Sequence, residues 1–150
     1  METNLKFNSA ICTSREQSER LLALGLKKET ADMVYKPHSH YPDEVINYCE
    51  PTPMVGPLRK YIIADDIDFR YYIPAWSLHR LKCLLPEKTP YGDGYLTVEI
   101  INENVYIVLV IENVEQRVLK YTKGNLYDNL ISCVNFFVKE SLFNKEYLEE

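Results

Sequence analysis

The strongest constraint on the fold is a repeated strand-and-turn pattern in the last third of the chain. Residues 95–100 alternate so that every second side chain is apolar, which is the period of a half-buried strand. Asn102-Glu103 and then Glu112-Asn113 interrupt the apolar residues at the intervals where hairpins turn. The pattern predicts a three-stranded antiparallel meander with strands at 95–100, 104–111 and 114–121.

The three segments differ in polarity, and the difference predicts their order in the sheet. Residues 105–111 are apolar on both faces, which favours the central position. The third strand carries Glu115, Arg117 and Lys120, and charged side chains are typical of a sheet edge. An open edge at 114–121 also allows pairing with a second copy, so a homodimer is one expected assembly.

Helix signals flank this meander. Ser14-Arg15-Glu16-Gln17 has the form of a capping box, and Gly25 is placed to end the helix that it starts. Pro74 suits the first turn of a second helix, and Asn125 suits the cap of a third, whose apolar stripe can cover the sheet. We predict helices at 14–24, 75–85 and 125–142, in an α+β domain whose mainly antiparallel sheet ends in the meander.

The rest of the chain gives weaker signals. Residues 1–13 are expected to form an N-terminal arm, and 14–150 a single domain. Five of the eight prolines fall in a Pro- and Tyr-rich loop at 36–58, where a regular helix or central strand is unfavourable. Thr30 is placed to cap a short helix that includes Met33. Two short strands are expected at 61–64 and 69–73.

Charge and cysteine content exclude several classes of protein. The chain has 150 residues with 17 basic and 22 acidic side chains, and this acidic balance argues against binding nucleic acid or an anionic membrane. Its longest strongly apolar run, 105–111, is far shorter than the roughly 20 residues that span a bilayer. Without a secretory signal, the four cysteines are expected to be reduced in a cytoplasm, with Cys83 and Cys133 in the core.

Twelve tyrosines are the one compositional excess, and they suggest a recognition surface. Tyrosine combines apolar area with a polar tip, which suits a protein or peptide partner. The alternative is that these rings pack half-buried on a sheet, for which tyrosine has a high propensity. The candidate binding residues are Tyr41, Tyr48, Tyr71, Tyr72 and Trp76.

An alternative site would bind a metal. Asp65, Asp66 and Asp68 follow a short predicted strand and can offer oxygen ligands to a hard cation. His38 and His40 lie two residues apart, so in an extended segment both imidazoles point the same way. A solvated turn and an exposed loop explain the same residues. The chain has no calcium-binding loop and no phosphate cradle, and we predict no cofactor.

Nucleophilic catalysis has little support in the sequence. The chain contains no G-x-S-x-G elbow, and its three histidines are His38, His40 and His79. A cysteine–histidine pair such as Cys49 with His79 stays open, because catalytic partners need closeness in space rather than in sequence.

Three stretches carry a resemblance to a known family. They are Cys12–Ser18 continuing to Thr30–Met33, then Ile73–Leu78 running to Leu84–Pro86, and Asp93–Glu99. Together they resemble a family of small, uncharacterised proteins of Bacteroides-type gut bacteria, often encoded near prophage or other mobile-element genes. The resemblance implies a bacterial, cytoplasmic and phage-related protein, and it supplies no activity, cofactor or catalytic residue.

These observations favour a non-enzymatic interaction or accessory protein that acts on a protein or peptide partner. The alternative is a small metal-binding module or metal-assisted hydrolase built on the aspartate cluster. An acidic mimic of nucleic acid is a weaker possibility, because the basic and acidic side chains are nearly balanced.

Overall fold

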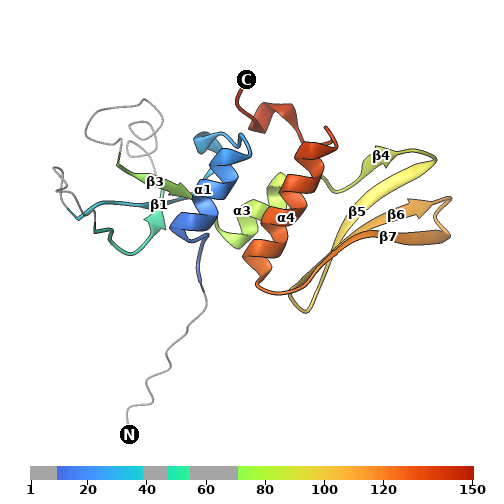
Figure 1. Ribbon diagram of the computed structural model, residues 1–150, viewed down its shortest axis with the longest axis horizontal. Coiled ribbons are helices and arrows are strands. Elements are labelled where there is room, and N and C mark those ends of the chain that lie inside the picture. The colour runs from blue at the N-terminus through green and yellow to red at the C-terminus, as the bar shows by residue number, and fades with distance from the viewer. Residues whose placement is uncertain (1–9, 39–46, 55–70) are drawn as a thin grey trace, which may run out of the picture.

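The computed structural model describes residues 10–38, 47–54 and 71–150, which form helices and two antiparallel sheets (Figure 1). The helices are α1 (Arg15–Ala23), α3 (Leu78–Leu84) and α4 (Leu126–Lys139), with 3₁₀ turns at Lys28–Thr30 and Lys145–Tyr147. The strands are β1 (Met33–Tyr35), β2 (Thr52–Pro53), β3 (Ile73–Ala75), β4 (Thr89–Tyr91), β5 (Gly94–Ile101), β6 (Asn104–Ile111) and β7 (Glu115–Thr122). The α+β class is therefore confirmed.

The C-terminal meander has the predicted strands in the predicted order. β6 pairs with β5 on one side and β7 on the other, which leaves β7 at the edge. Asn102 and Glu103 turn the first hairpin with positive φ values of 48° and 68°, as a two-residue hairpin requires. The sheet also contains a short strand that the sequence did not predict, since β4 pairs with β5 through Thr89 and Leu96.

Gly94 makes the close approach of β5 and β6 possible. A Cβ at this position would lie 2.1 Å from the carbonyl oxygen of Val110. Only glycine therefore fits where β5 begins against β6.

The first part of the chain forms a second sheet, with the order β2-β1-β3, rather than joining the meander. The predicted short helix after Thr30 is wrong, because Met33 lies in β1 between Pro53 and Ala75. Pairing on both sides outweighs the local capping signal at Thr30, whose hydroxyl instead donates to the carbonyl of Lys27 at 2.7 Å.

The start of the second predicted helix is also wrong. Pro74 lies in β3 opposite Val34, and α3 begins four residues later. Ser77 is the true N-cap, since its hydroxyl accepts the backbone N–H of Arg80. The carboxylate of Asp32 in turn accepts the backbone N–H of Ser77 at 2.8 Å and its hydroxyl, so the loop before β1 holds the start of α3.

The other two helix starts are confirmed. Ser14 and Gln17 form both hydrogen bonds of the capping box at α1, and Gly25 follows that helix with a φ of 90°. The side chain of Asn125 accepts the backbone N–H groups of Tyr127 and Asp128 at the start of α4. α4 ends three residues earlier than predicted, where Ser141 adopts a positive φ.

One core joins the two sheets through the helices. Val34 of the first sheet and Trp76, which directly follows β3, belong to the same buried cluster as Leu96 and Ile107 of the second sheet and Phe137 of α4. Burial begins at Cys12, which is 3% exposed, so the last two residues of the predicted arm belong to the packed body. Of the predicted strand at 69–73, Ile73 lies in β3, whereas the strand at 61–64 falls outside the described residues.

Candidate functional site

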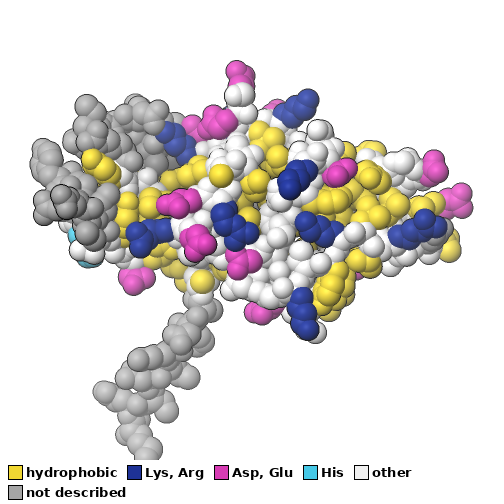
Figure 2. Space-filling model, in the orientation of Figure 1, with side chains coloured by type: hydrophobic (Ala, Val, Ile, Leu, Met, Phe, Trp, Pro, Cys, Tyr) yellow, Lys and Arg dark blue, Asp and Glu magenta, His cyan; other side chains and the backbone are white. Residues whose placement is uncertain are grey.

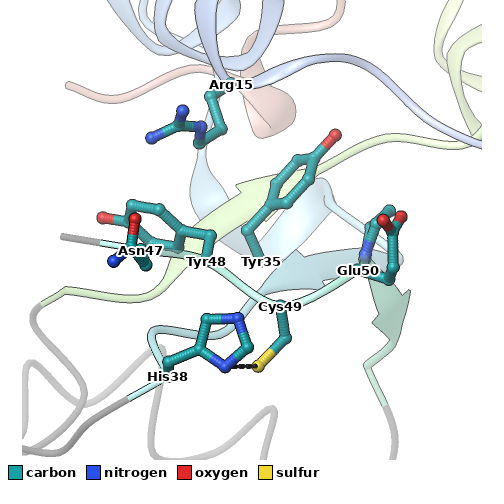
Figure 3. A pocket seen from close by; sticks show the side chains of 8 residues that line it. Arg15, Tyr35, His38, Asn47, Tyr48, Cys49 and Glu50 are labelled. Atoms are coloured by element: carbon teal, nitrogen blue, oxygen red, sulfur yellow. Dashed lines mark hydrogen bonds between the residues drawn. The ribbon is translucent and has the colours of Figure 1, made fainter.

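A pocket of about 500 Å³ lies beside the first sheet, next to residues that flank β1 and precede β2 (Figure 3). Its lining combines a cation, a carboxylate, an imidazole, a thiol and two phenols. The lining residues are Arg15, Tyr35, His38, Asn47, Tyr48, Cys49, Glu50 and Pro51.

Backbone pairing within the Pro- and Tyr-rich loop brings an imidazole and a thiol together. The backbone N–H of His38 donates to Asn47 at 2.9 Å, and that of Cys49 donates to Lys36 at 2.8 Å. The two side chains leave this ladder on the same side, with Nδ1 of His38 3.4 Å from Sγ of Cys49 (Figure 3). The sequence leaves open a pair between Cys49 and His79. In the structure, Nε2 of His79 instead lies 3.5 Å from Sγ of Cys83.

Tyr48 is a predicted binding residue that does lie in the pocket. The guanidinium carbon of Arg15 is 4.8 Å from the centroid of its ring, a cation–π contact. Its hydroxyl donates to the backbone carbonyl of Tyr71 at 3.1 Å. Burial raises the pKa of Tyr48, so the phenol stays neutral and acts as a donor at physiological pH.

Tyr35 closes the pocket from the β1 side. Its hydroxyl donates to the carbonyl of Thr13 at 2.8 Å and accepts from the thiol of Cys12 at 3.7 Å. Burial, followed by the hydrogen bond with Cys12, raises the pKa of Tyr35 well above its ordinary value. Tyr35 therefore fixes the wall of the pocket as a neutral group.

The other predicted binding residues lie elsewhere. Trp76 is fully buried, and its indole N–H donates to Oγ1 of Thr30 at 2.9 Å, so it belongs to the core and not to a surface. Tyr71 and Tyr72 are half-buried, and Tyr72 packs against the main core. Tyr41 lies outside the described residues.

Most of the proposed metal ligands also fall outside the described residues, namely Asp65, Asp66, Asp68 and His40. His38 is described, and its neighbour in the pocket is Cys49. Across 10–38, 47–54 and 71–150, no group of three or more His, Cys, Asp or Glu side chains is arranged to hold a metal ion. The metal alternative stays a prediction from the sequence.

The cysteines divide into two buried and two accessible thiols. Cys133 lies in the core as predicted, and burial raises its pKa to about 12. Cys12 is also buried, and burial raises its pKa. The expectation for Cys83 is wrong: α3 turns Leu81 and Leu84 to the core, which leaves Cys83 exposed on the opposite side of this short helix.

The edge strand β7 carries a second candidate site that the sequence reasoning missed. Its pairing with β6 slips by one residue, so Val118 lies opposite Val108 and Lys120 opposite Ile107, while Leu119 is the extra residue that lies opposite no residue of β6. Lys120 therefore turns toward α4, where its ammonium donates to the carbonyl of Ser132 at 3.5 Å. We define the β7 rim as Val114, Val118, Leu119 and Tyr121, whose exposed fractions are 87%, 58%, 41% and 49%.

The apolar surface continues from the rim across the sheet. Val105 and Ile107 of β6 face the core under α4, whereas the intervening Tyr106 lies outside that core cluster. Tyr106 stacks on Tyr121 with ring centroids 4.9 Å apart, and Ile101 is 52% exposed. Figure 2 shows hydrophobic side chains gathered over this sheet, with lysine and arginine side chains among them.

The signal for the rim was present in the sequence. Val118, Leu119 and Tyr121 are apolar residues on the strand that the charges had already placed at the edge. The bulge at Leu119 hid their orientation, because strict alternation would have put Val118 and Lys120 on one face.

Within the described residues, no helix combines the length and apolar character needed to cross a membrane. The resemblance to the small bacterial family stays a prediction, because comparison with protein-family models, curated proteins and solved structures gave no match.

Proposed function

We propose that the protein is a non-enzymatic interaction protein that binds an extended segment of a partner protein along β7. The observation that carries this proposal is the β7 rim, an apolar strip along and just before an eight-residue strand that pairs only with β6 among the described residues. Such a strand offers unpaired backbone N–H and C=O groups beside apolar side chains.

Strand addition is the binding mode that this geometry favours. Sheet edges are usually protected by charges, covering segments or short length, because an exposed apolar edge promotes association. β7 has charges, but its bulge turns Lys120 toward α4 and leaves Val118 and Leu119 accessible. A partner strand would gain main-chain hydrogen bonds from the edge and apolar contacts from the rim.

Charge indicates what the partner segment contains. The chain has a net charge of −5, yet β7 and the residue after it carry three basic side chains, Arg117, Lys120 and Lys123, against one acidic side chain, Glu115. A positive strip on an acidic protein attracts acidic segments and repels further copies of itself. We therefore propose a partner segment that alternates apolar and acidic residues. Its place in an accessory system of a prophage or mobile element rests on the sequence resemblance alone.

The test is a selection of random twelve-residue peptides on the immobilised full-length chain, followed by affinity measurements on the enriched peptides. We expect enrichment of peptides in which apolar and acidic residues alternate. The substitution Val118→Lys is expected to weaken their binding at least tenfold, because it places a charge in the rim. Ile11→Lys is the matched control, since Ile11 is also 58% exposed but lies at the other end of the chain.

Two results would overturn the proposal. One is equal loss of affinity in Val118→Lys and Ile11→Lys, which would place the peptide elsewhere. The other is a wild-type dimer in sedimentation equilibrium that Val118→Lys dissociates, because the rim would then be occupied by a second copy of this chain.

A further inference from the structure

The pocket beside the first sheet has chemistry that strand addition does not use. In Figure 1 the first sheet and the four-stranded sheet lie on opposite sides of the helices, so the pocket is separate from the β7 rim. The pocket contains one thiol, one imidazole and room for a small molecule.

We propose that Cys49 is a nucleophilic thiol that exchanges with small disulfides, with His38 as the group that takes its proton. The proposal rests on the 3.4 Å separation of Sγ and Nδ1 and on the place of both residues in the wall of the pocket (Figure 3). An imidazole within hydrogen-bond distance of a thiol is the arrangement that activates cysteine as a nucleophile.

The backbone holds the pair in this geometry. The isolated bridge between Pro37 and Tyr48 is flanked by two main-chain hydrogen bonds, one from His38 to Asn47 and one from Cys49 to Lys36, so His38 and Cys49 lie diagonally on the same face. Cys49 is half-buried and His38 exposed, so the sulfur is accessible from the pocket without being free in solution. With the ring proton on Nε2, Nδ1 of His38 is an acceptor facing the thiol.

The exchange needs no reagent beyond the disulfide itself. The thiol proton of Cys49 passes to Nδ1 of His38 as Sγ attacks one sulfur of the disulfide. A new Sγ–S bond forms, the original S–S bond breaks, and the released thiolate takes the proton back from the imidazolium. Cys49 is left in a mixed disulfide, and a free thiol of the reagent is the other product.

The remaining cysteines serve as comparisons within the same chain. Cys12 and Cys133 are buried, so a disulfide has no path to them in the folded protein. Cys83 has the same chemical partner as Cys49, since its sulfur lies 3.5 Å from Nε2 of His79, but it sits on the exposed side of α3. Because both thiols have a neighbouring imidazole, a faster reaction of Cys49 than of Cys83 would show that the pocket itself contributes to the rate.

The test uses 2-hydroxyethyl disulfide, which is small and uncharged, with the full-length reduced protein at pH 7. Site-resolved mass spectrometry follows the mixed disulfide at each cysteine. We expect Cys49 to react first, about tenfold faster than Cys83, and His38→Asn to slow Cys49 about tenfold without changing Cys83. The matched variant His79→Asn should leave the rate at Cys49 unchanged.

Two outcomes would overturn the assignment. The first is a rate at Cys49 no greater than at Cys83 in the wild-type protein. The second is an equal rate at Cys49 in the wild-type protein and in His38→Asn, with both proteins shown to be folded by circular dichroism. Neither outcome bears on peptide binding at the β7 rim.

Discussion

Trp76 donates its indole N–H to Oγ1 of Thr30 at 2.9 Å, and both residues are buried. The hydroxyl of Thr30 in turn donates a hydrogen bond to the carbonyl of Lys27 at 2.7 Å. These two hydrogen bonds connect the residue that follows β3 with the 3₁₀ turn that precedes β1, so they hold the two segments together beside the first sheet.

Removal of the indole should destabilise the protein. Trp76→Phe deletes a buried donor and leaves a cavity beside Thr30, and we expect a loss of about 2–3 kcal/mol in the free energy of unfolding. Urea denaturation followed by circular dichroism measures it. The exposed residue Leu22, changed to alanine, is the control and should cost less than about 0.5 kcal/mol. Equal effects of the two substitutions would show that the buried hydrogen bond contributes nothing.

Two glycines near the start of β5 should respond differently to alanine. Gly94→Ala places a Cβ 2.1 Å from the carbonyl oxygen of Val110, so strands β5 and β6 must separate. Gly92→Ala meets no atom within 4 Å and costs only the strain of a φ of 55°. We expect about 1 kcal/mol for Gly92→Ala and at least 3 kcal/mol for Gly94→Ala in the free energy of unfolding. A smaller effect at Gly94 would contradict the register of β5 and β6.

Stability should fall at alkaline pH because buried acids resist ionisation in the folded state. Burial raises the pKa of Cys133 from 9.0 to about 12. The unfolded chain ionises first, so the stabilisation is complete below pH 9 and is lost as the pH rises toward 12. Each pH unit in that window should cost on the order of 1 kcal/mol.

Urea denaturation under reducing conditions at pH 7 and pH 10 checks this pH dependence. Cys133→Ala should lose less stability than the wild-type protein between the two values. Cys12 and Tyr35, whose pKa values burial also raises, should still contribute in the same direction. An identical pH dependence in wild type and Cys133→Ala would contradict the assignment to Cys133.

The surface ion pair between α1 and α4 should matter little. Arg20 and Asp128 approach to 2.8 Å, but both side chains are nearly half exposed. Water and salt screen such a pair, so Arg20→Ala should lower the free energy of unfolding by less than about 1 kcal/mol. Asp128 also accepts from the side chain of Gln17 at 3.0 Å, which keeps the helices connected in that variant. Thermal unfolding at low and high salt provides the measurement. A loss in the free energy of unfolding well above 1 kcal/mol would contradict the view that solvent screens the pair.

The meander was predictable because its local signals and its long-range pairing agree. Turn residues at Asn102-Glu103 and Glu112-Asn113, with apolar residues between them, specify adjacent strands joined by short hairpins. Thr30 and Pro74 show the opposite case. Each carries a genuine helix-start signal, but β1 gains neighbours on both sides from segments about 20 and 40 residues away. Such non-local pairing has no signature in a local window.

The two candidate sites were hidden for related reasons. The sequence identified the Pro- and Tyr-rich loop, Tyr48 and His38, but the pairing of His38 with Cys49 depends on a backbone register between residues 36–38 and 47–49. The β7 rim depends on one bulge at Leu119, which changes the face on which Val118 and Lys120 lie. A shift of one residue in strand register changes which side chains a surface exposes, and the amino-acid composition does not reveal it.

The most direct test of strand addition is amide hydrogen exchange on the wild-type chain, alone and with a selected peptide bound. Strand addition should slow exchange at alternate residues of β7, whose amides point away from β6, and leave exchange in β4 at the opposite edge unchanged. Unchanged exchange throughout β7, with protection instead around Arg15, Tyr48 and Cys49, would contradict it.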